Sequence, residues 1–161
     1  MIASAAYTPE GWHDFFLAIV GAAAALAGLV FVALSINLTR ILSFPWLPGR
    51  AAETVGVLFE ALVVSALCLV PEPRLALGLE LVAVGVAGWS FPLVLQVRGR
   101  AEMTQQGRTE FFAGRVVATQ IATIPVIVAG ASLSAHAGGG FYWLVPRVGF
   151  LLLVGVVRFR S

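Results

Sequence analysis

Five ionisable side chains lie inside long apolar stretches of this 161-residue sequence, and they are its strongest candidates for chemistry. Glu53 and Glu60 are seven residues apart in the stretch 51–70, so a helix there places both carboxylates on one face. Arg115 lies near the start of the stretch 111–133. On insertion scales an ionisable group at the centre of a bilayer costs at least about 2.5–3.5 kcal/mol, so it is kept where it is paired, hydrated or used.

We expect these side chains to form two polar clusters. The first, at one end of the helices, comprises Glu53, Glu60, Arg115 and Thr119. The second is a pair between Glu80 and Arg147, which stand at similar depth near the other end, because an arginine favours a carboxylate that accepts two parallel hydrogen bonds. Two interpretations remain open. The clusters are clasps that hold the helices in order, or they line a hydrated path for an ion or proton in which Glu60 titrates.

The residues that enzymes use are scarce in this chain. All ten basic residues are arginine, so P-loop phosphate binding and Schiff-base chemistry, which need a lysine, are excluded. Cys68 is the sole cysteine, and His13 and His136 have no partner at metal-ligand spacing. Neither a His-Glu-x-x-His nor a Gly-x-Ser-x-Gly motif is present. We therefore expect a protein without enzymatic activity, metal or cofactor.

The composition indicates that the solvent of this chain is a lipid bilayer. Hydrophobic residues make up 60% of the chain and charged residues 11%, whereas a soluble domain has roughly 45–50% apolar and about 25% charged residues. The mean hydropathy is +0.97. A net charge of +2 without a basic patch excludes a typical nucleic-acid binder. The sequence predicts an all-α integral membrane bundle.

About five transmembrane helices are predicted, because a helix of about 20 mostly apolar residues crosses the hydrocarbon core. They cover roughly residues 12–38, 51–70, 75–97, 111–133 and 141–157. The fifth is short and contains Pro146 and Arg147, so four spans with an interfacial segment are the alternative. The connecting loops hold about a dozen residues at most, which predicts a single transmembrane domain over residues 1–161 and no soluble domain.

The arginines predict how the helices are oriented. At least seven lie in or next to the loops 39–50 and 98–110 and in the C-terminal tail, against Arg74 alone on the opposite side. Because cytoplasmic loops are rich in basic residues, this distribution places the N-terminus outside and the C-terminus in the cytoplasm. Aromatic residues in 12–16 and 141–143 mark the outer interface. Under this orientation the first polar cluster faces the cytoplasm.

Small residues recur on one face of the first predicted helix. They are Gly21, Ala24, Ala25 and Gly28, spaced as i, i+3, i+4 and i+7. Small residues on one face let two helix backbones approach closely, which is how helices associate in lipid. This helix-packing face is either a seam between copies of the chain or a contact inside one bundle.

Three segments resemble a group of small bacterial multipass proteins that are often labelled "modulator of FtsH protease". They are Gly11-Trp-His-Asp-Phe-Phe, Ala25-Leu-Ala-Gly-Leu-Val-Phe-Val-Ala-Leu-Ser-Ile-Asn-Leu and Arg50-Ala-Ala-Glu-Thr, within residues 11–60. The resemblance implies a partnership with a membrane-bound protease and supplies no catalytic residue. It highlights Trp12, His13, Asp14, Ser35, Asn37, Arg50 and Glu53. The arginine and alanine usage is typical of a bacterium with a GC-rich genome.

From these observations we expect a multipass protein of the bacterial inner membrane that acts as an accessory or regulatory protein through helix–helix contacts. Its expected partners are the lipid bilayer and either a second copy of the chain or another membrane protein, with no nucleic acid. The alternative function is a small oligomeric ion channel or proton-coupled transporter with Glu60 in its pathway.

Overall fold

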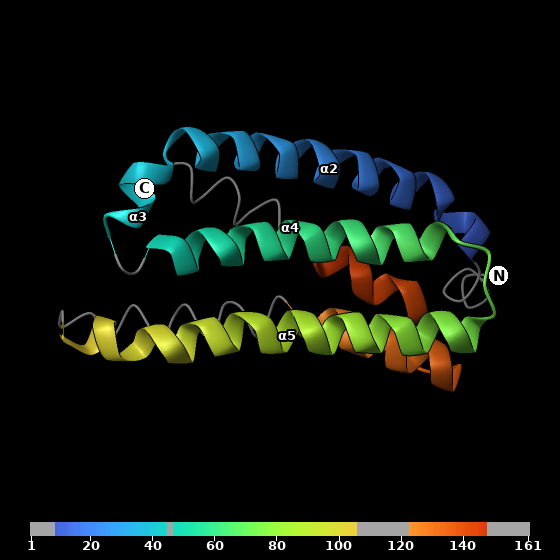
Figure 1. Ribbon diagram of the computed structural model, residues 1–161. Coiled ribbons are helices and arrows are strands. Elements are labelled where there is room, and N and C mark those ends of the chain that lie inside the picture. The colour runs from blue at the N-terminus through green and yellow to red at the C-terminus, as the bar shows by residue number, and fades with distance from the viewer. Residues whose placement is uncertain (1–8, 45–46, 106–122, 148–161) are drawn as a thin grey trace.

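The computed structural model describes residues 9–44, 47–105 and 123–147, and within them the chain is helical (Figure 1). Its elements are the 3-10 helix η1 (Pro9–Trp12), α2 (His13–Ile36), α3 (Leu38–Leu42), α4 (Leu47–Leu69), α5 (Arg74–Gln105), an apolar helix Thr123–Ala135, and the 3-10 helix η2 (Gly140–Trp143). After η2 the chain continues as a helix through residues 144–147. No strand occurs in the described residues, as the sequence predicts.

Three of these helices are long and apolar enough to cross a membrane. They are His13–Ile36, Leu47–Leu69 and the Arg74–Val97 part of α5, with 24, 23 and 24 residues. At 1.5 Å per residue each exceeds the roughly 30 Å of hydrocarbon in a bilayer. They coincide with the first three predicted spans, 12–38, 51–70 and 75–97. The fourth predicted span is described only over Thr123–Ala135, and the rest of it lies outside the described residues.

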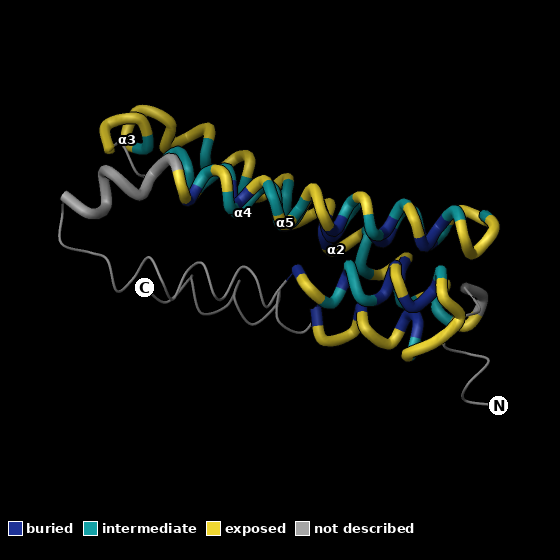
Figure 2. The backbone as a smooth tube through the Cα atoms, turned by 90° about the horizontal axis from the view of Figure 1, so that it is seen from below, coloured by how far each residue is buried: buried dark blue, intermediate teal, exposed yellow. Residues whose placement is uncertain are grey.

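The long helices form one layer, with α4 between α2 and α5 (Figure 1). The five-residue helix α3 turns the chain from α2 into α4. Pro71 and Pro73 lie in the short link between α4 and α5, where proline restricts the preceding residue and ends the helix. Residues 123–147 lie against one face of this layer, near the end where α2 begins (Figure 2).

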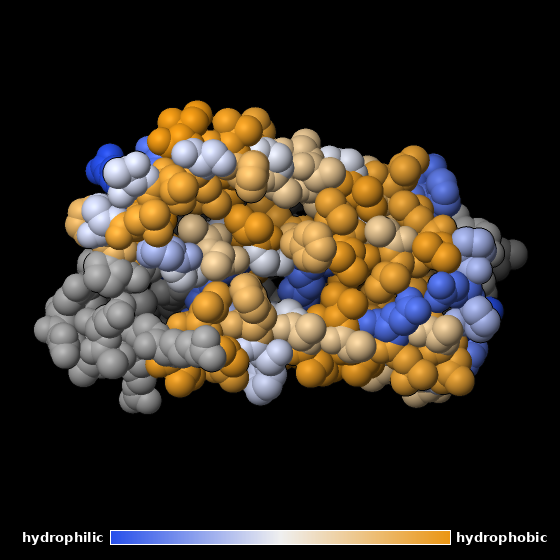
Figure 3. All heavy atoms as spheres, in the orientation of Figure 1, coloured by the Kyte–Doolittle hydropathy of each residue, from blue (hydrophilic) through white to orange (hydrophobic). Residues whose placement is uncertain are grey.

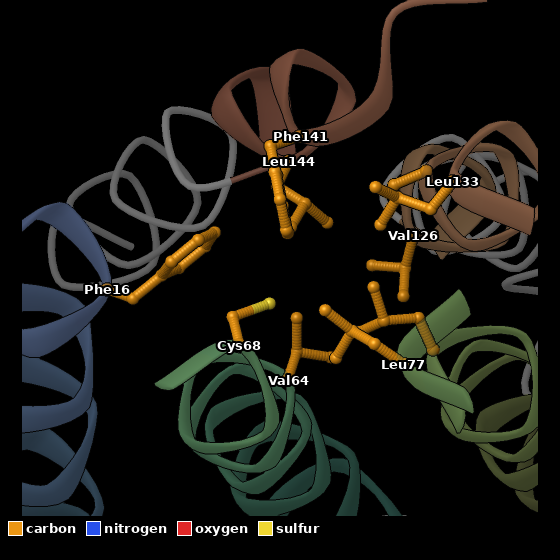
Figure 4. Packing of buried hydrophobic residues seen from close by; sticks show 10 residues of the cluster. Phe16, Val64, Cys68, Leu77, Val126, Leu133, Phe141 and Leu144 are labelled. Carbon is orange, nitrogen blue, oxygen red and sulfur yellow. The ribbon is translucent and has the colours of Figure 1, made fainter. Parts of the chain in front are cut away.

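The buried apolar core lies where these two layers meet. Its residues are Phe16, Val64, Cys68, Leu77, Leu81, Val126, Ala129, Leu133, Phe141 and Leu144. They come from α2, α4, α5, the helix 123–135 and the segment after it, and their side chains converge in Figure 4. Cys68 has 2% of its surface exposed and packs as a small apolar residue. The core therefore anchors the C-terminal segment to the layer of long helices.

The outside of the bundle is apolar, as a bilayer requires. Large side chains such as Leu29, Phe31, Ile36 and Phe59 are 62–78% exposed. Figure 3 shows hydrophobic residues over most of the visible face, with hydrophilic ones near its two ends and in a smaller patch near its middle. Soluble monomers rarely expose large contiguous apolar patches, and such patches mark contact with a membrane or with another protein. The exposed surface thus agrees with the composition.

Glycines bring α5 very close to the helix 123–135. A Cβ atom added at Gly130 would lie 2.7 Å from the backbone oxygen of Gly78 and 2.8 Å from the nitrogen of Val82. A Cβ added at Gly78 would meet the backbone of Gly130 in turn, at 2.9 Å from its oxygen. The two backbones can touch because neither residue has a side chain, which is the close packing that membrane helices use.

Candidate functional site

A buried ion pair between Glu60 and Arg147 is the most unusual feature of the structure. The Nη2 atom of Arg147 donates to Oε2 of Glu60 at 2.6 Å, and the two side chains are 4% and 6% exposed. Glu60 lies on α4, between residues that face the core, and Arg147 lies in the short helix after η2. The pair therefore links the middle of a membrane-length helix to the C-terminal segment.

Gly88 of α5 completes this site. A Cβ atom added at Gly88 would overlap the carboxyl group of Glu60, so this carboxyl group occupies the space that a side chain would take. Sequence reasoning missed Gly88. A glycine in the predicted span 75–97, next in sequence to the span that carries Glu60, is the feature of the sequence that could have pointed to it. The remaining carboxylate oxygen, Oε1 of Glu60, is buried and receives no hydrogen bond from the described residues.

The pairing of Arg147 differs from the one expected from the sequence. Arg147 was expected to pair with Glu80, but its guanidinium contacts Glu60, and Oε2 of Glu80 is buried and accepts no hydrogen bond from the described residues. The expectation matched the two residues by depth alone. In the structure the segment that carries Arg147 packs toward α2 and α4, where Phe16 and Val64 line a cavity with it. Arg147 therefore pairs with Glu60 because the segment that carries it faces α4.

The other predicted cluster residues have different outcomes. Glu53 is 4% exposed and Glu60 6%, so both lie on the buried face of α4, as their spacing predicts. Arg115 and Thr119 lie outside the described residues. Gln96 of α5 is only 1% exposed and was not singled out from the sequence, because a lone glutamine in a helix carries no distinctive pattern.

The predicted helix-packing face of α2 does not contact the described bundle. Its four residues, Gly21, Ala24, Ala25 and Gly28, are all exposed. A Cβ atom added at Gly21 or Gly28 would meet nothing within 4 Å. The buried residues of α2 are Phe16 and Ala23, which lie on the side that packs against α4. The interpretation as a contact inside one bundle is therefore not supported by the described residues.

An aromatic cluster joins the two segments that were predicted to mark the outer interface. The ring of Trp12 lies 5.0 Å from that of Tyr142 and 6.3 Å from that of Phe141, measured between centroids. Phe15 and Phe16 extend the cluster from α2. Three of these pairs, Trp12 with Tyr142, Trp12 with Phe15 and Phe15 with Phe16, meet edge to face, a geometry that stabilises the structure beyond the area it buries. The cluster ties the start of α2 to the segment that leads to Arg147.

The chain between the helix 123–135 and η2 turns through left-handed backbone conformations. His136 has a φ of 52°, and Gly138, Gly139 and Gly140 have φ values of 90°, 109° and 53°. Glycine adopts these angles without steric cost. The side chain of Ser132 accepts a hydrogen bond from the backbone nitrogen of Gly140 at 2.8 Å, which fixes the turn. This turn sends the chain back along the bundle and so positions Arg147.

Within the described residues no group of three histidine, cysteine, aspartate or glutamate side chains could hold a metal ion. Neither a protein-family model, nor a curated protein, nor a solved structure matches this chain. The resemblance to modulators of FtsH protease accordingly stays a prediction from the sequence. The site is a buried ion pair between Glu60 and Arg147, and Gly88 leaves room for the carboxyl group. The pair joins α4 to the C-terminal segment.

Proposed function

We propose that this chain is a non-enzymatic accessory or regulatory protein of the bacterial inner membrane that works through helix–helix contacts. It spans the membrane five times, with its N-terminus outside and its C-terminus in the cytoplasm. Three membrane-length helices and the arginine distribution support this arrangement. The resemblance within residues 11–60 favours a membrane-bound protease as the partner, and a second copy of the chain is the other candidate.

The proposal rests on the helix-packing face of α2, which points away from the described bundle. Of the three long helices α2 is the least buried, and its exposed side presents Gly21, Ala24, Ala25 and Gly28 with open space above both glycines. Membrane helices associate through such faces, because small residues let backbones approach closely. None of the described residues covers this face, and in this proposal it is the surface that meets the partner.

The test is to reconstitute the chain in vesicles with the membrane-bound protease of a bacterium and to measure how fast a membrane substrate is degraded. Gly28→Leu fills the outward face, while Ala22→Leu adds the same bulk to an exposed position outside that face. We expect wild type and Ala22→Leu to change the degradation rate equally and Gly28→Leu to lose the effect. If wild type leaves the rate unchanged, the protease partnership is wrong. Equal activity of both variants would show that this face is not the contact.

The second candidate function is a small channel or proton-coupled transporter with Glu60 in its pathway. The observation that favours it is Oε1 of Glu60, which is buried and accepts no hydrogen bond from the described residues. Against it, Oε2 is held by Arg147 and Gly88 closes over the carboxyl group. Ion and proton flux in liposomes with wild type, Glu60→Gln and the control Glu72→Gln separates the two functions. Flux through wild type that Glu72→Gln keeps, and that Glu60→Gln loses although this variant is shown to be folded and inserted, would replace the accessory function with transport.

A further inference from the structure

The end of the bundle where α2 passes into α4 lies at the level of a membrane surface. The helix α2 has 24 residues and ends at Ile36, and α3 begins two residues later, at Leu38. Because 24 helical residues cover about 36 Å and the hydrocarbon core of a bilayer about 30 Å, α3 lies where the hydrocarbon meets the lipid headgroups. At the same end α5 continues beyond its membrane-length part, from Val97 to Gln105 (Figure 1).

The helix α3 and the two residues after it combine large apolar side chains with a positive charge. Leu38 is 53% exposed, Leu42 65% and Phe44 46%, and Arg40 is exposed as well. Leu38 and Leu42 are four residues apart and share one face of the helix, whereas Arg40 lies two residues from each and points to the other side. Figure 3 shows hydrophobic and hydrophilic residues side by side at this end. We call Leu38, Arg40, Leu42 and Phe44 the α3 surface.

The exposed charged side chains that the structure describes at this end are Arg40 and Arg50, the latter in the first turn of α4. Arg40 pairs with no carboxylate of the described residues. The nearest acidic residue in the sequence, Glu53, is only 4% exposed. A phosphate group is the complementary partner of such a surface, because a guanidinium donates two parallel hydrogen bonds to phosphate oxygens.

We propose that the α3 surface binds an anionic phospholipid, with the guanidinium of Arg40 on the headgroup phosphate and the exposed leucines among the acyl chains. Segments with one apolar and one basic face lie in the membrane interface in this way. A lipid fits this surface better than a free phosphate ion, because Leu38 and Leu42 flank the arginine in the sequence and an ion leaves them in water. Arg50 adds a second positive charge at the same end of the bundle. The inference needs only that the long helices cross a membrane, so it does not depend on the proposed function.

Native mass spectrometry of the full-length protein, released from lipid nanodiscs, tests the inference. The nanodiscs contain equal amounts of phosphatidylglycerol, which is anionic, and phosphatidylethanolamine, which is zwitterionic, with the same acyl chains. We expect wild type to retain several-fold more phosphatidylglycerol, and we expect this preference to fall with added salt, because salt screens exposed charges. Equal retention of the two lipids by wild type would overturn the proposal without any variant.

Arg40→Gln tests whether the α3 surface is the site. It should lower the preference for phosphatidylglycerol by up to about five-fold, the effect of one arginine near an anionic membrane surface. Arg74→Gln is the matched control, because Arg74 is exposed at the opposite end of the bundle and its loss changes the net charge equally. Arg40→Lys should keep most of the preference, since the charge remains. Equal losses in Arg40→Gln and Arg74→Gln would contradict the assignment to the α3 surface.

Inorganic phosphate distinguishes a lipid site from a site for free anions. We expect an excess of inorganic phosphate to leave the retained phosphatidylglycerol at its level in chloride of the same ionic strength, because the free ion has no acyl chains to cover Leu38 and Leu42. Displacement of the lipid by phosphate but not by chloride would overturn the lipid assignment.

Discussion

The guanidinium of Arg147 and the carboxylate of Glu60 lie 2.6 Å apart at a buried position, although the two residues are far apart in the sequence. An ion pair in an apolar interior is stable as a pair, because the loss of either partner leaves an uncompensated buried charge. The ion pair therefore holds the C-terminal segment at one position on α4. Gly88 on α5 also contributes, because the carboxyl group of Glu60 occupies the space that a side chain at this position would take.

Replacing Glu60 by glutamine should destabilise the protein strongly. Arg147 then loses its charged partner, and breaking a buried ion pair typically costs about 3–5 kcal/mol. Unfolding in detergent, followed by circular dichroism, measures the free-energy change. Glu72→Gln is the control, because Glu72 lies in the link between α4 and α5. Equal stability of the two variants would show that the ion pair does not hold the bundle.

Replacing both partners by apolar residues should restore most of the lost stability. In the double variant Glu60→Leu with Arg147→Met no charge remains buried at this site, and such exchanges are often neutral or stabilising by about 1–4 kcal/mol. The same unfolding experiment should rank the double variant above either single variant. A double variant that is less stable than both singles would contradict a purely structural clasp and favour a functional use of the charges.

Gly88→Ala should destabilise the protein by about 1–3 kcal/mol, as overpacking of a filled site typically does. The added Cβ would overlap the carboxyl group of Glu60 and displace it from Arg147. Gly28→Ala is the matched control, because a Cβ there meets nothing within 4 Å. We expect the control to be neutral or slightly stabilising, since alanine favours helix over glycine by up to about 1 kcal/mol. Similar losses in both variants would contradict this explanation.

Gly130→Ala should cost about 3 kcal/mol or prevent folding, at the upper end of overpacking effects. Its Cβ would meet backbone atoms of Gly78 and Val82, which cannot rotate away as a side chain can. Gly21→Ala, at an open position on α2, serves as the control. The yield of folded protein and its unfolding midpoint give the readout. A well-folded Gly130→Ala protein would disprove the close approach of these two helices.

The proposed orientation predicts which end of the chain can be labelled from outside. A tag at the N-terminus should be accessible in cells whose outer barrier has been opened but whose inner membrane is intact. A tag at the C-terminus should become accessible only after the inner membrane is permeabilised, because the arginine-rich side stays in the cytoplasm. C-terminal labelling before permeabilisation would reverse the topology.

The local pattern of the sequence determined the long helices of the fold. The stretches 12–38, 51–70 and 75–97 are apolar over a membrane thickness, and each forms a helix of that length. The spacing of Glu53 and Glu60 likewise determined that they share one buried face of α4. These properties depend only on neighbours along the chain, since helix length and helix periodicity are set by consecutive residues.

Only the tertiary structure decided which residues meet across helices. Depth along the membrane made Glu80 a plausible partner of Arg147, but the glycine turn and the aromatic cluster direct the C-terminal segment toward α4 and hence toward Glu60. The same packing turned the small residues of α2 outward and brought Gly88 onto the carboxyl group. Periodicity tells which residues share a face, whereas the neighbour of that face depends on how all helices pack at once.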